Sequence, residues 1–197
     1  MIGIINYGTG NIQSVYNAFE YLGAKVKLIQ PGQIEGMDAL VLPGVGAFKD
    51  ITFQLDPYKK TIVNFLKSGK PFLGICIGLQ YLFEESYENG RWKGLGFFKG
   101  QVKKLPGKKL PQIGWNTLMV KKRTPLLNKI SSGSFVYYMN SYAVIGENPF
   151  ATSYYGTEFA AVVGAGNVFA TQFHPEKSGR IGLQILENFI EVAGQCL

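Results

Sequence analysis

The sequence predicts an α/β protein with a doubly wound, mostly parallel sheet and an antiparallel extension. In the first half of the chain, short apolar runs alternate with amphipathic stretches, which is the pattern of strands separated by crossover helices. From about residue 96, short strand candidates follow one another at turn signals, with no helix between them. The 197 residues are 46% hydrophobic and 17% charged, enough to bury one sizeable core, and we expect a single domain over residues 1–197.

The first half contains four predicted strands and three predicted helices. The strands are expected at residues 2–6, 25–29, 39–42 and 72–75, and the helices at residues 11–22, about 50–68 and 77 to about 85. Ligands of such sheets bind beyond the carboxyl ends of the strands. Cys76 directly follows the last of these strands, so it falls at the ligand-binding end.

The second half predicts the antiparallel extension and a closing helix. Strands are expected at residues 101–105, 117–120, 135–139, 154–155, 159–163 and 168–171, and a helix at about 179–193. No internal repeat or Pro/Ser-rich linker divides the chain, which supports the expectation of one domain.

The net charge of +7 raises the question of a nucleic-acid partner. The basic residues lie in turn-rich stretches with Gly and Pro, not on an arm or a recognition helix. A solvated face or an acidic protein partner explains them more simply, and we expect no nucleic acid. The residues concerned are Lys99, Lys103, Lys104, Lys108, Lys109, Lys121, Lys122 and Arg123.

Cysteine and histidine usage indicates a metal-free protein without disulfides. Cys76 and Cys196 do not form a disulfide framework, and two cysteines with one histidine cannot make an ordinary zinc site. The chain opens into a strand-like run at residues 2–5 without a basic segment before it, and its apolar runs are far too short to span a bilayer. We expect a cytoplasmic protein that uses no cofactor and does not bind membranes.

Cys76 lies in the segment Gly-Ile-Cys-Ile-Gly-Leu-Gln at residues 74–80, after the apolar run 71–73. A strand that enters Gly-x-Cys-x-Gly and then a helix has the form of a nucleophile elbow, in which the flanking glycines allow a sharp turn that exposes the nucleophile. A lone cysteine in an apolar stretch is more often a small core residue. The glycines on both sides favour the nucleophile.

A thiol is only slightly ionised at neutral pH without a partner, and the chain has one histidine to supply it. His174 stands in Gln-Phe-His-Pro-Glu at residues 172–176. Pro175 restricts the backbone, and residues two apart in an extended segment share a face, so Glu176 could orient the ring. Alone, the segment could equally be a loop turn. The two segments together predict a Cys-His-Glu triad.

Two glycine-rich turns have weaker signals. Residues 43–48, Pro-Gly-Val-Gly-Ala-Phe, could donate a backbone N–H to a developing oxyanion, although such turns are common between a strand and a helix. Residues 7–11 resemble the start of a dinucleotide fingerprint, but the third glycine position is Gln13, so a plain turn is the better interpretation. The aromatic and amide-rich segments 111–116 and 137–142 are interpreted as core and interface residues.

Taken in order, these segments resemble the class I glutamine amidotransferases over essentially the whole chain. The elbow at residues 74–80 and Phe-His-Pro-Glu at 173–176 carry the resemblance. Pro-Gly-Val-Gly-Ala-Phe, Ile-Gly-Trp-Asn at 113–116 and the tail Lys-Ser-Gly at 177–179 indicate the subfamily of glutaminase subunits that serves imidazole glycerol phosphate synthesis. The resemblance implies the class I glutamine amidotransferase fold.

The resemblance also implies roles for individual residues. Cys76 would be the nucleophile that forms a glutamyl thioester, His174 the general base and acid, and Glu176 its orienting residue. Peptide N–H groups at Val45 and Ile77 would form the oxyanion hole. L-Glutamine would be bound by Gly44, Gly46, Gln80 and the backbone at Ser141 and Tyr142.

A partner subunit is implied in the same way. Members of the family pass ammonia through a tunnel to a (β/α)₈-barrel synthase subunit in a heterodimer, which makes imidazole glycerol phosphate and an aminoimidazole carboxamide ribotide in histidine biosynthesis. Asn11, Trp115 and Asn116 would face that subunit. Gln112 and Asn140 replace residues that are often histidine in the family, which bears on communication between the subunits.

Three alternatives remain at this level. Paralogous subunits serve amidation in surface-polysaccharide synthesis, which would change the acceptor and not the donor. A noncatalytic regulatory domain would show an altered nucleophile or base, whereas Cys76, His174 and Glu176 are all present. A different cysteine hydrolase, such as a peptidase, would release product from a peptide in place of glutamine.

Overall fold

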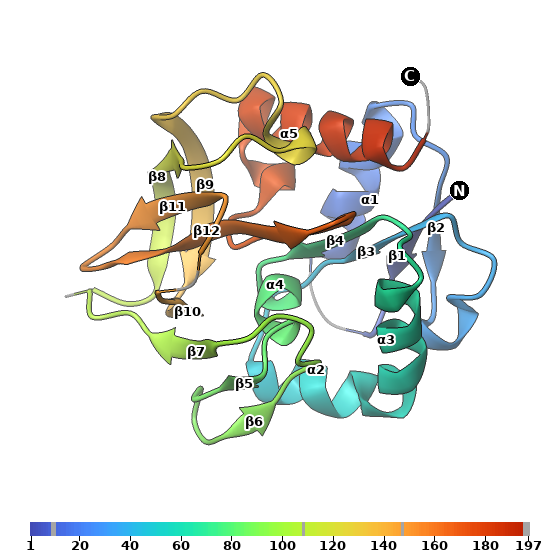
Figure 1. Ribbon diagram of the computed structural model, residues 1–197, viewed down its shortest axis with the longest axis horizontal. Coiled ribbons are helices and arrows are strands. Elements are labelled where there is room, and N and C mark those ends of the chain that lie inside the picture. The colour runs from blue at the N-terminus through green and yellow to red at the C-terminus, as the bar shows by residue number, and fades with distance from the viewer. Residues whose placement is uncertain (9–10, 108, 147, 195–197) are drawn as a thin grey trace.

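The computed structural model describes residues 1–8, 11–107, 109–146 and 148–194, and a large twisted sheet runs through it (Figure 1). Thr9, Gly10, Lys108 and Cys196 lie outside the described residues. Five strands are parallel: β1 (Ile2–Ile5), β2 (Val26–Ile29), β3 (Ala39–Leu42), β4 (Phe72–Ile75) and β13 (Val168–Thr171). Four antiparallel strands extend it: β12 (Glu158–Ala165), β11 (Ala151–Tyr154), β8 (Gln112–Val120) and β9 (Ser134–Asn140).

The order across this sheet is β2-β1-β3-β4-β13-β12-β11-β8-β9. A second sheet has the order β10-β7-β5-β6 and consists of β10 (Tyr142–Val144), β7 (Gln101–Lys104), β5 (Glu85–Ser86) and β6 (Trp92–Lys93). The arrangement confirms the predicted α/β fold with a parallel sheet and an antiparallel extension.

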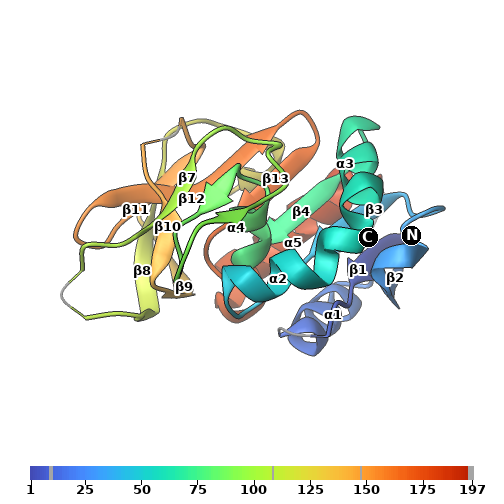
Figure 2. The same cartoon turned by 90° about the horizontal axis from the view of Figure 1, so that it is seen from below.

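Helices cover both faces of the parallel strands. The helices α1 (Ile12–Tyr21) and α5 (Gly179–Val192) lie on one face, and α2 (Phe48–Leu55), α3 (Lys59–Lys67) and α4 (Ile77–Tyr81) lie on the other (Figure 1). Seen from below, α2, α3 and α4 lie on the near side of the sheet (Figure 2). Four short 3₁₀ helices complete the described elements: η1 (Pro31–Gln33), η2 (Asp56–Tyr58), η3 (Pro125–Leu127) and η4 (Pro175–Lys177). None of the described helices combines the length and the hydrophobicity needed to cross a bilayer.

Successive residues of the central strands point to opposite faces, which divides the core in two. In β3, Ala39 and Val41 pack in the cluster that includes α1 and α5, whereas Leu40 and Leu42 pack in the cluster of α2, α3 and α4. All four are fully buried. A strand that is apolar on both faces is typical of a parallel sheet covered on both sides.

Two predicted helices have different bounds in the structure. The single helix predicted at about 50–68 is wrong, because Pro57 in η2 lacks an N–H and separates α2 from α3. The helix predicted from residue 77 to about 85 ends at Tyr81. The Tyr81 carbonyl accepts from the Leu95 N–H at 2.7 Å, and the carbonyls of the three residues after it also accept from the segment at residues 94–98, so the chain does not continue as a helix.

The antiparallel region also differs from the prediction. The strand predicted at 117–120 begins at Gln112, because residues 112–118 pair with β9 from Gln112 opposite Asn140 to Leu118 opposite Ser134. Gly114 within it has φ +131°. Because glycine is more typical of turns than of strands, the sequence did not indicate a strand over these residues. The strand predicted at 154–155 is Ala151–Tyr154, and β10 was not predicted.

Candidate active site

Cys76 occupies the junction between β4 and α4 with φ +55° and ψ −104°. A positive φ is uncommon for a residue with a side chain, and it persists only where the surroundings hold it. Here the Cys76 N–H donates to the Thr171 carbonyl of β13 at 2.7 Å, and its carbonyl accepts from the Gln80 N–H at 3.1 Å. The backbone is therefore fixed on both sides of the thiol.

The flanking glycines allow α4 to start directly against the sheet. A Cβ on Gly78 would lie 2.1 Å from the Leu42 carbonyl oxygen at the end of β3. A Cβ on Gly74 would lie 2.8 Å from the Gly78 carbonyl oxygen. No side chain fits at either position without moving the backbone, which explains the Gly-x-Cys-x-Gly spacing in the sequence.

His174 and Glu176 form a buried pair. The distance from His174 Nδ1 to Glu176 Oε1 is 2.8 Å, and the two side chains are 1% and 0% exposed. They meet because His174 is extended and Glu176 lies in the 3₁₀ turn η4, so the geometry is tighter than the extended segment we expected. The His174 N–H donates to the Tyr137 carbonyl at 2.9 Å, which ties the histidine to β9.

Electrostatics couple this pair to Cys76. Burial alone would lower the pKa of His174, but the Cys76 sulfur and the Glu176 carboxylate both favour the imidazolium and raise that pKa to about 10. The other ring nitrogen, Nε2, is buried and has no hydrogen-bond partner among the described residues. The contacts with Cys76 and Glu176 therefore favour the charged form of the ring.

Asn11 lies beside the carboxylate of this pair. Its Nδ2 donates to Glu176 Oε1 at 3.2 Å, and its Oδ1 accepts from the Ser14 hydroxyl at 2.7 Å. Because the Glu176 carboxylate can only accept, the NH₂ group of Asn11 must face it, and Asn11 supports Glu176 from the residue before α1. The sequence placed Asn11 at a partner surface and gave no sign of this contact.

A pocket of about 200 Å³ opens at Cys76. The predicted residues that line it with Cys76 are Val45, Gly46, Ile77, Gln80, Ser141 and Tyr142. Pro111, Met139, Asn140 and Glu88 also line it. Gly44 does not line the pocket, since it is buried with Tyr7 and Ile77, and a Cβ there would lie 1.9 Å from the Tyr7 hydroxyl oxygen.

Glu88 is a pocket residue that sequence reasoning missed. Its carboxylate accepts a hydrogen bond from the Phe48 N–H at 2.7 Å. Burial raises the pKa of Glu88 above its usual range, with the Phe48 N–H opposing and Asp50 adding to the shift. Glu88 lies in an irregular segment after β5, where nothing in the local sequence marks a ligand contact. It gives the pocket wall an acidic group suited to a ligand ammonium.

Trp115 and Asn116 lie on opposite faces of β8. Trp115 is 56% exposed and packs edge-on against Tyr137, with ring centroids 6.0 Å apart. Asn116 points the other way and donates to the Tyr154 carbonyl at 2.9 Å. The two residues therefore cannot contact one partner across the same sheet face, although both were expected to face it.

Trp115 belongs to an apolar surface that we call the outer sheet face. Its large exposed side chains come from three neighbouring strands and are 45% to 67% exposed. They are Ile113, Trp115 and Met119 of β8, Phe135 of β9 and Tyr154 of β11.

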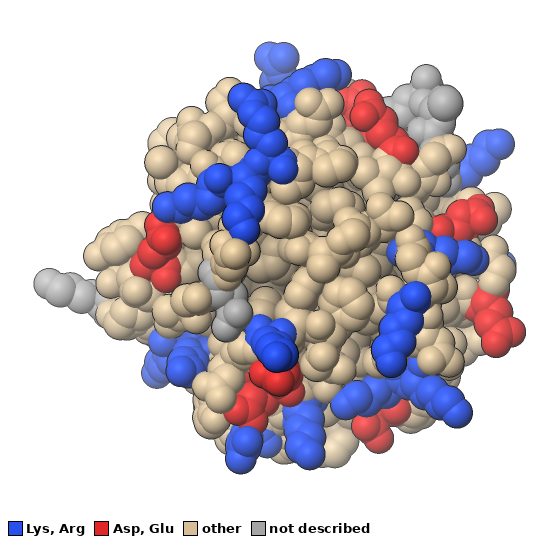
Figure 3. Space-filling view, in the orientation of Figure 1, with Lys and Arg blue, Asp and Glu red and all other residues tan. Residues whose placement is uncertain are grey.

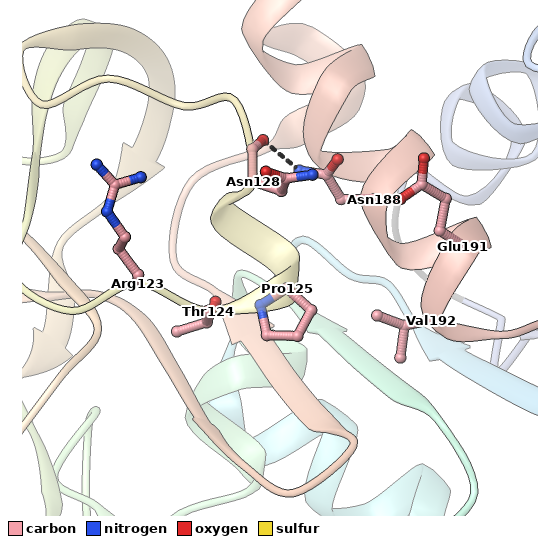
Figure 4. Close-up of a pocket in the computed structure, with 7 residues that line it drawn as sticks. All are labelled: Arg123, Thr124, Pro125, Asn128, Asn188, Glu191 and Val192. Atoms are coloured by element: carbon pink, nitrogen blue, oxygen red, sulfur yellow. Dashed lines mark hydrogen bonds between the residues drawn. The ribbon is translucent and has the colours of Figure 1, made fainter.

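Larger hollows lie elsewhere and have a different character. One of about 510 Å³ lies between η3 and α5 (Figure 4). Asn188 in it already donates to the carbonyls of Asn128 at 2.7 Å and Leu126 at 2.9 Å, so its amide fastens η3 to α5. Another, of about 530 Å³, is lined by basic side chains including Lys122 and Lys129. Neither contains a cysteine or histidine.

The surface charge and the arrangement of possible metal ligands do not indicate a second site among the described residues. On the face seen in Figure 3, Lys and Arg side chains gather over the segment between β8 and β9, and elsewhere they alternate with acidic ones. Across the described residues, no group of three or more His, Cys, Asp or Glu side chains is placed to hold a metal ion.

The unique histidine offers a direct test of the electrostatic coupling. In a Cys76→Ala variant, the sulfur that raises the pKa of His174 is gone while burial still lowers it, so the titration midpoint of the ring should fall by about one unit or more. NMR of the imidazole protons against pH measures it without ambiguity, because the chain has one histidine. An unchanged midpoint would show that sulfur and ring do not interact.

Comparison with known proteins places the chain in a family. The model of the family "Glutamine amidotransferase class-I" matches residues 3–192. The imidazole glycerol phosphate synthase subunit HisH of Caldanaerobacter subterraneus subsp. tengcongensis is 48% identical over 204 residues, covering 100% of both chains. The subunit HisH of Methanosarcina mazei is 48% identical over 198 residues, covering 97% of this chain and 98% of its own.

Solved structures share the fold. One glutamine amidotransferase superposes with a TM-score of 0.75 at 21% identity, covering 98% of this chain and 99% of the other. PurLQS from Thermotoga maritima gives a TM-score of 0.76 at 20% identity, with 96% and 97% covered. The family match and the full-length relatives show that the chain belongs to the class I glutamine amidotransferases, in the group of the HisH subunits of imidazole glycerol phosphate synthase.

Proposed function

We propose that the chain hydrolyses glutamine at Cys76 and supplies the ammonia to a synthase subunit. The Cys76 sulfur attacks the side-chain amide carbon of glutamine, and His174 gives its proton to the departing ammonia, which leaves a glutamyl thioester. Water then attacks the thioester, with His174 taking a proton from it, and glutamate is released as the thiolate re-forms. Glu176 holds Nδ1 so that Nε2 performs both transfers.

The observation that carries this proposal is the joint placement of the three groups. The thiol lies on the pocket wall and belongs to a residue whose positive φ is held by the surrounding backbone. The buried His174-Glu176 pair beside it favours a protonated imidazole, which can donate a proton during the reaction. A cysteine that only filled the core would need neither the strained backbone nor the ion pair. This arrangement supports acyl transfer on a small substrate.

The pocket suits the amino-acid end of glutamine. Glu88 would take the α-ammonium group, and the backbone at Ser141 and Tyr142 would hold the rest of that end. The N–H groups of Val45 and Ile77 are assigned to the oxyanion, and both residues line the pocket with Cys76. A volume of about 200 Å³ can hold a small substrate such as an amino acid.

The outer sheet face is the proposed docking surface for the synthase subunit. Monomeric proteins rarely expose so many large apolar side chains together. Met139 of β9 lines the pocket, and Tyr137 on the same side of that strand packs against the exposed Trp115, so the face adjoins the pocket. The relatives are named as subunits of imidazole glycerol phosphate synthase, and we assign the occupant as the (β/α)₈-barrel subunit of that enzyme, which would receive the ammonia.

The catalytic assignment is tested by replacing the nucleophile. Cys76→Ala should abolish glutamine hydrolysis, while the complex with the synthase subunit should still form its product from added ammonia, because the acceptor site lies outside the thiol chemistry. Both rates can be followed in one assay with glutamine or an ammonium salt. Retained glutamine hydrolysis would remove Cys76 from the mechanism, and loss of both reactions would make its role structural.

Docking on the outer sheet face is tested by charge insertion. Phe135→Asp should weaken binding to the synthase subunit by at least about tenfold, because it buries a charge in the apolar contact. The matched control is Tyr21→Asp, at an exposed residue of α1, which should bind normally. Titration calorimetry gives both affinities, and thermal melts check that each variant is folded. Equal affinities for the two variants would place the interface elsewhere.

A further inference from the structure

Gln172 is a buried amide that the mechanism above does not use. It follows the last residue of β13, precedes His174 by two positions and is 0% exposed. Its N–H donates to the Ala161 carbonyl of β12 at 2.9 Å, which holds its backbone in the sheet. A polar side chain buried this completely needs hydrogen-bond partners, and those partners show what it does.

Both ends of the Gln172 side chain are engaged at the site. Its Nε2 lies 3.6 Å from the Cys76 sulfur, within the longer range of hydrogen bonds to sulfur. Its Oε1 accepts from Gln80 Nε2 at 3.1 Å. The same Gln80 nitrogen donates to the Tyr142 carbonyl at 2.9 Å, so an amide chain runs from the sulfur to the pocket wall.

The direction of this chain is fixed by its last member. A backbone carbonyl can only accept, so Gln80 must present its NH₂ group to Tyr142. Gln172 must then present its oxygen to the Gln80 nitrogen, and its own NH₂ group is left facing Cys76. The donor therefore points at sulfur for a reason that does not depend on the choice of amide flip.

A donor at this position favours the anionic sulfur. The Cys76 thiol could instead donate to the Met139 carbonyl, but that distance is 4.0 Å against 3.6 Å for the Gln172 contact. The nearer group stabilises the thiolate, and the more distant one would stabilise the neutral thiol. Gln172 therefore adds a hydrogen-bond donor to the sulfur, beside the favourable charge of His174.

We propose that Gln172 is a positioning residue that holds the Cys76 thiolate in the orientation for attack. The inference rests on the proposed role of Cys76 as nucleophile. Gln172 does not line the pocket, so it acts on the reaction through the sulfur and not through substrate binding. Its loss should lower the turnover number for glutamine and leave KM nearly unchanged.

The test is the pH dependence of Cys76 alkylation by iodoacetamide, followed by mass spectrometry of the peptide that contains Cys76. Gln172→Met keeps the length of the side chain and removes the donor, so the midpoint should rise by about one pH unit. Gln172→Glu keeps an acceptor for Gln80 but turns a carboxylate toward the sulfur, so the midpoint should rise further. Because glutamate is nearly the same size as glutamine, the Gln172→Glu variant allows the test even if the methionine variant does not fold.

The matched control is Gln184→Met, on α5 and away from the pocket, which should alkylate like the unmodified chain. A wild-type midpoint in folded Gln172→Met and Gln172→Glu would overturn the inference, as would a change in KM without a change in kcat. The proposed function fails by a different result, namely glutamine hydrolysis that survives complete alkylation of Cys76.

Discussion

The close contact between the start of α4 and the ends of β3 and β4 is the constraint on which the site depends. A Cβ at Gly78 would meet the Leu42 carbonyl oxygen at 2.1 Å, so the second residue of the helix must be a glycine. With the helix seated so closely, the one residue between β4 and α4 must adopt φ +55° to join them, and that residue is Cys76. The sheet supplies the energy that holds this conformation, because Cys76 N–H is bound to β13.

Once the thiol is placed, charge and hydrogen bonding give it chemistry. β13 runs beside β4, and the segment after it brings Gln172 and then His174 to the same end of the sheet. His174 is buried, which opposes its positive charge, yet Cys76 and Glu176 outweigh that effect. Cys76 and His174 are therefore brought together by two adjacent parallel strands, while η4 and Asn11 hold the Glu176 carboxylate against the His174 ring.

The sequence was informative wherever function and fold are encoded locally. The elbow around Cys76 and the His-Pro-Glu segment were readable because glycine and proline restrict the backbone within a few residues. The contacts of Asn11, Glu88 and Gln172 were not, since they join segments up to 165 positions apart. For the same reason β8 was predicted too short, as its first residues become a strand only by pairing with β9. The opposite orientations of Trp115 and Asn116 follow from that unrecognised strand.

The central claim is that the Cys76 sulfur becomes covalently linked to the substrate during turnover. The most direct measurement is mass spectrometry of the peptide containing Cys76 after the complex with its synthase subunit is mixed with glutamine and quenched in acid within the first turnovers. The account predicts a glutamyl adduct on that peptide, which disappears when the glutamine is consumed. The account would be contradicted if ammonia were released while Cys76 stayed unmodified at every time point, whether the adduct appeared on another residue or on none.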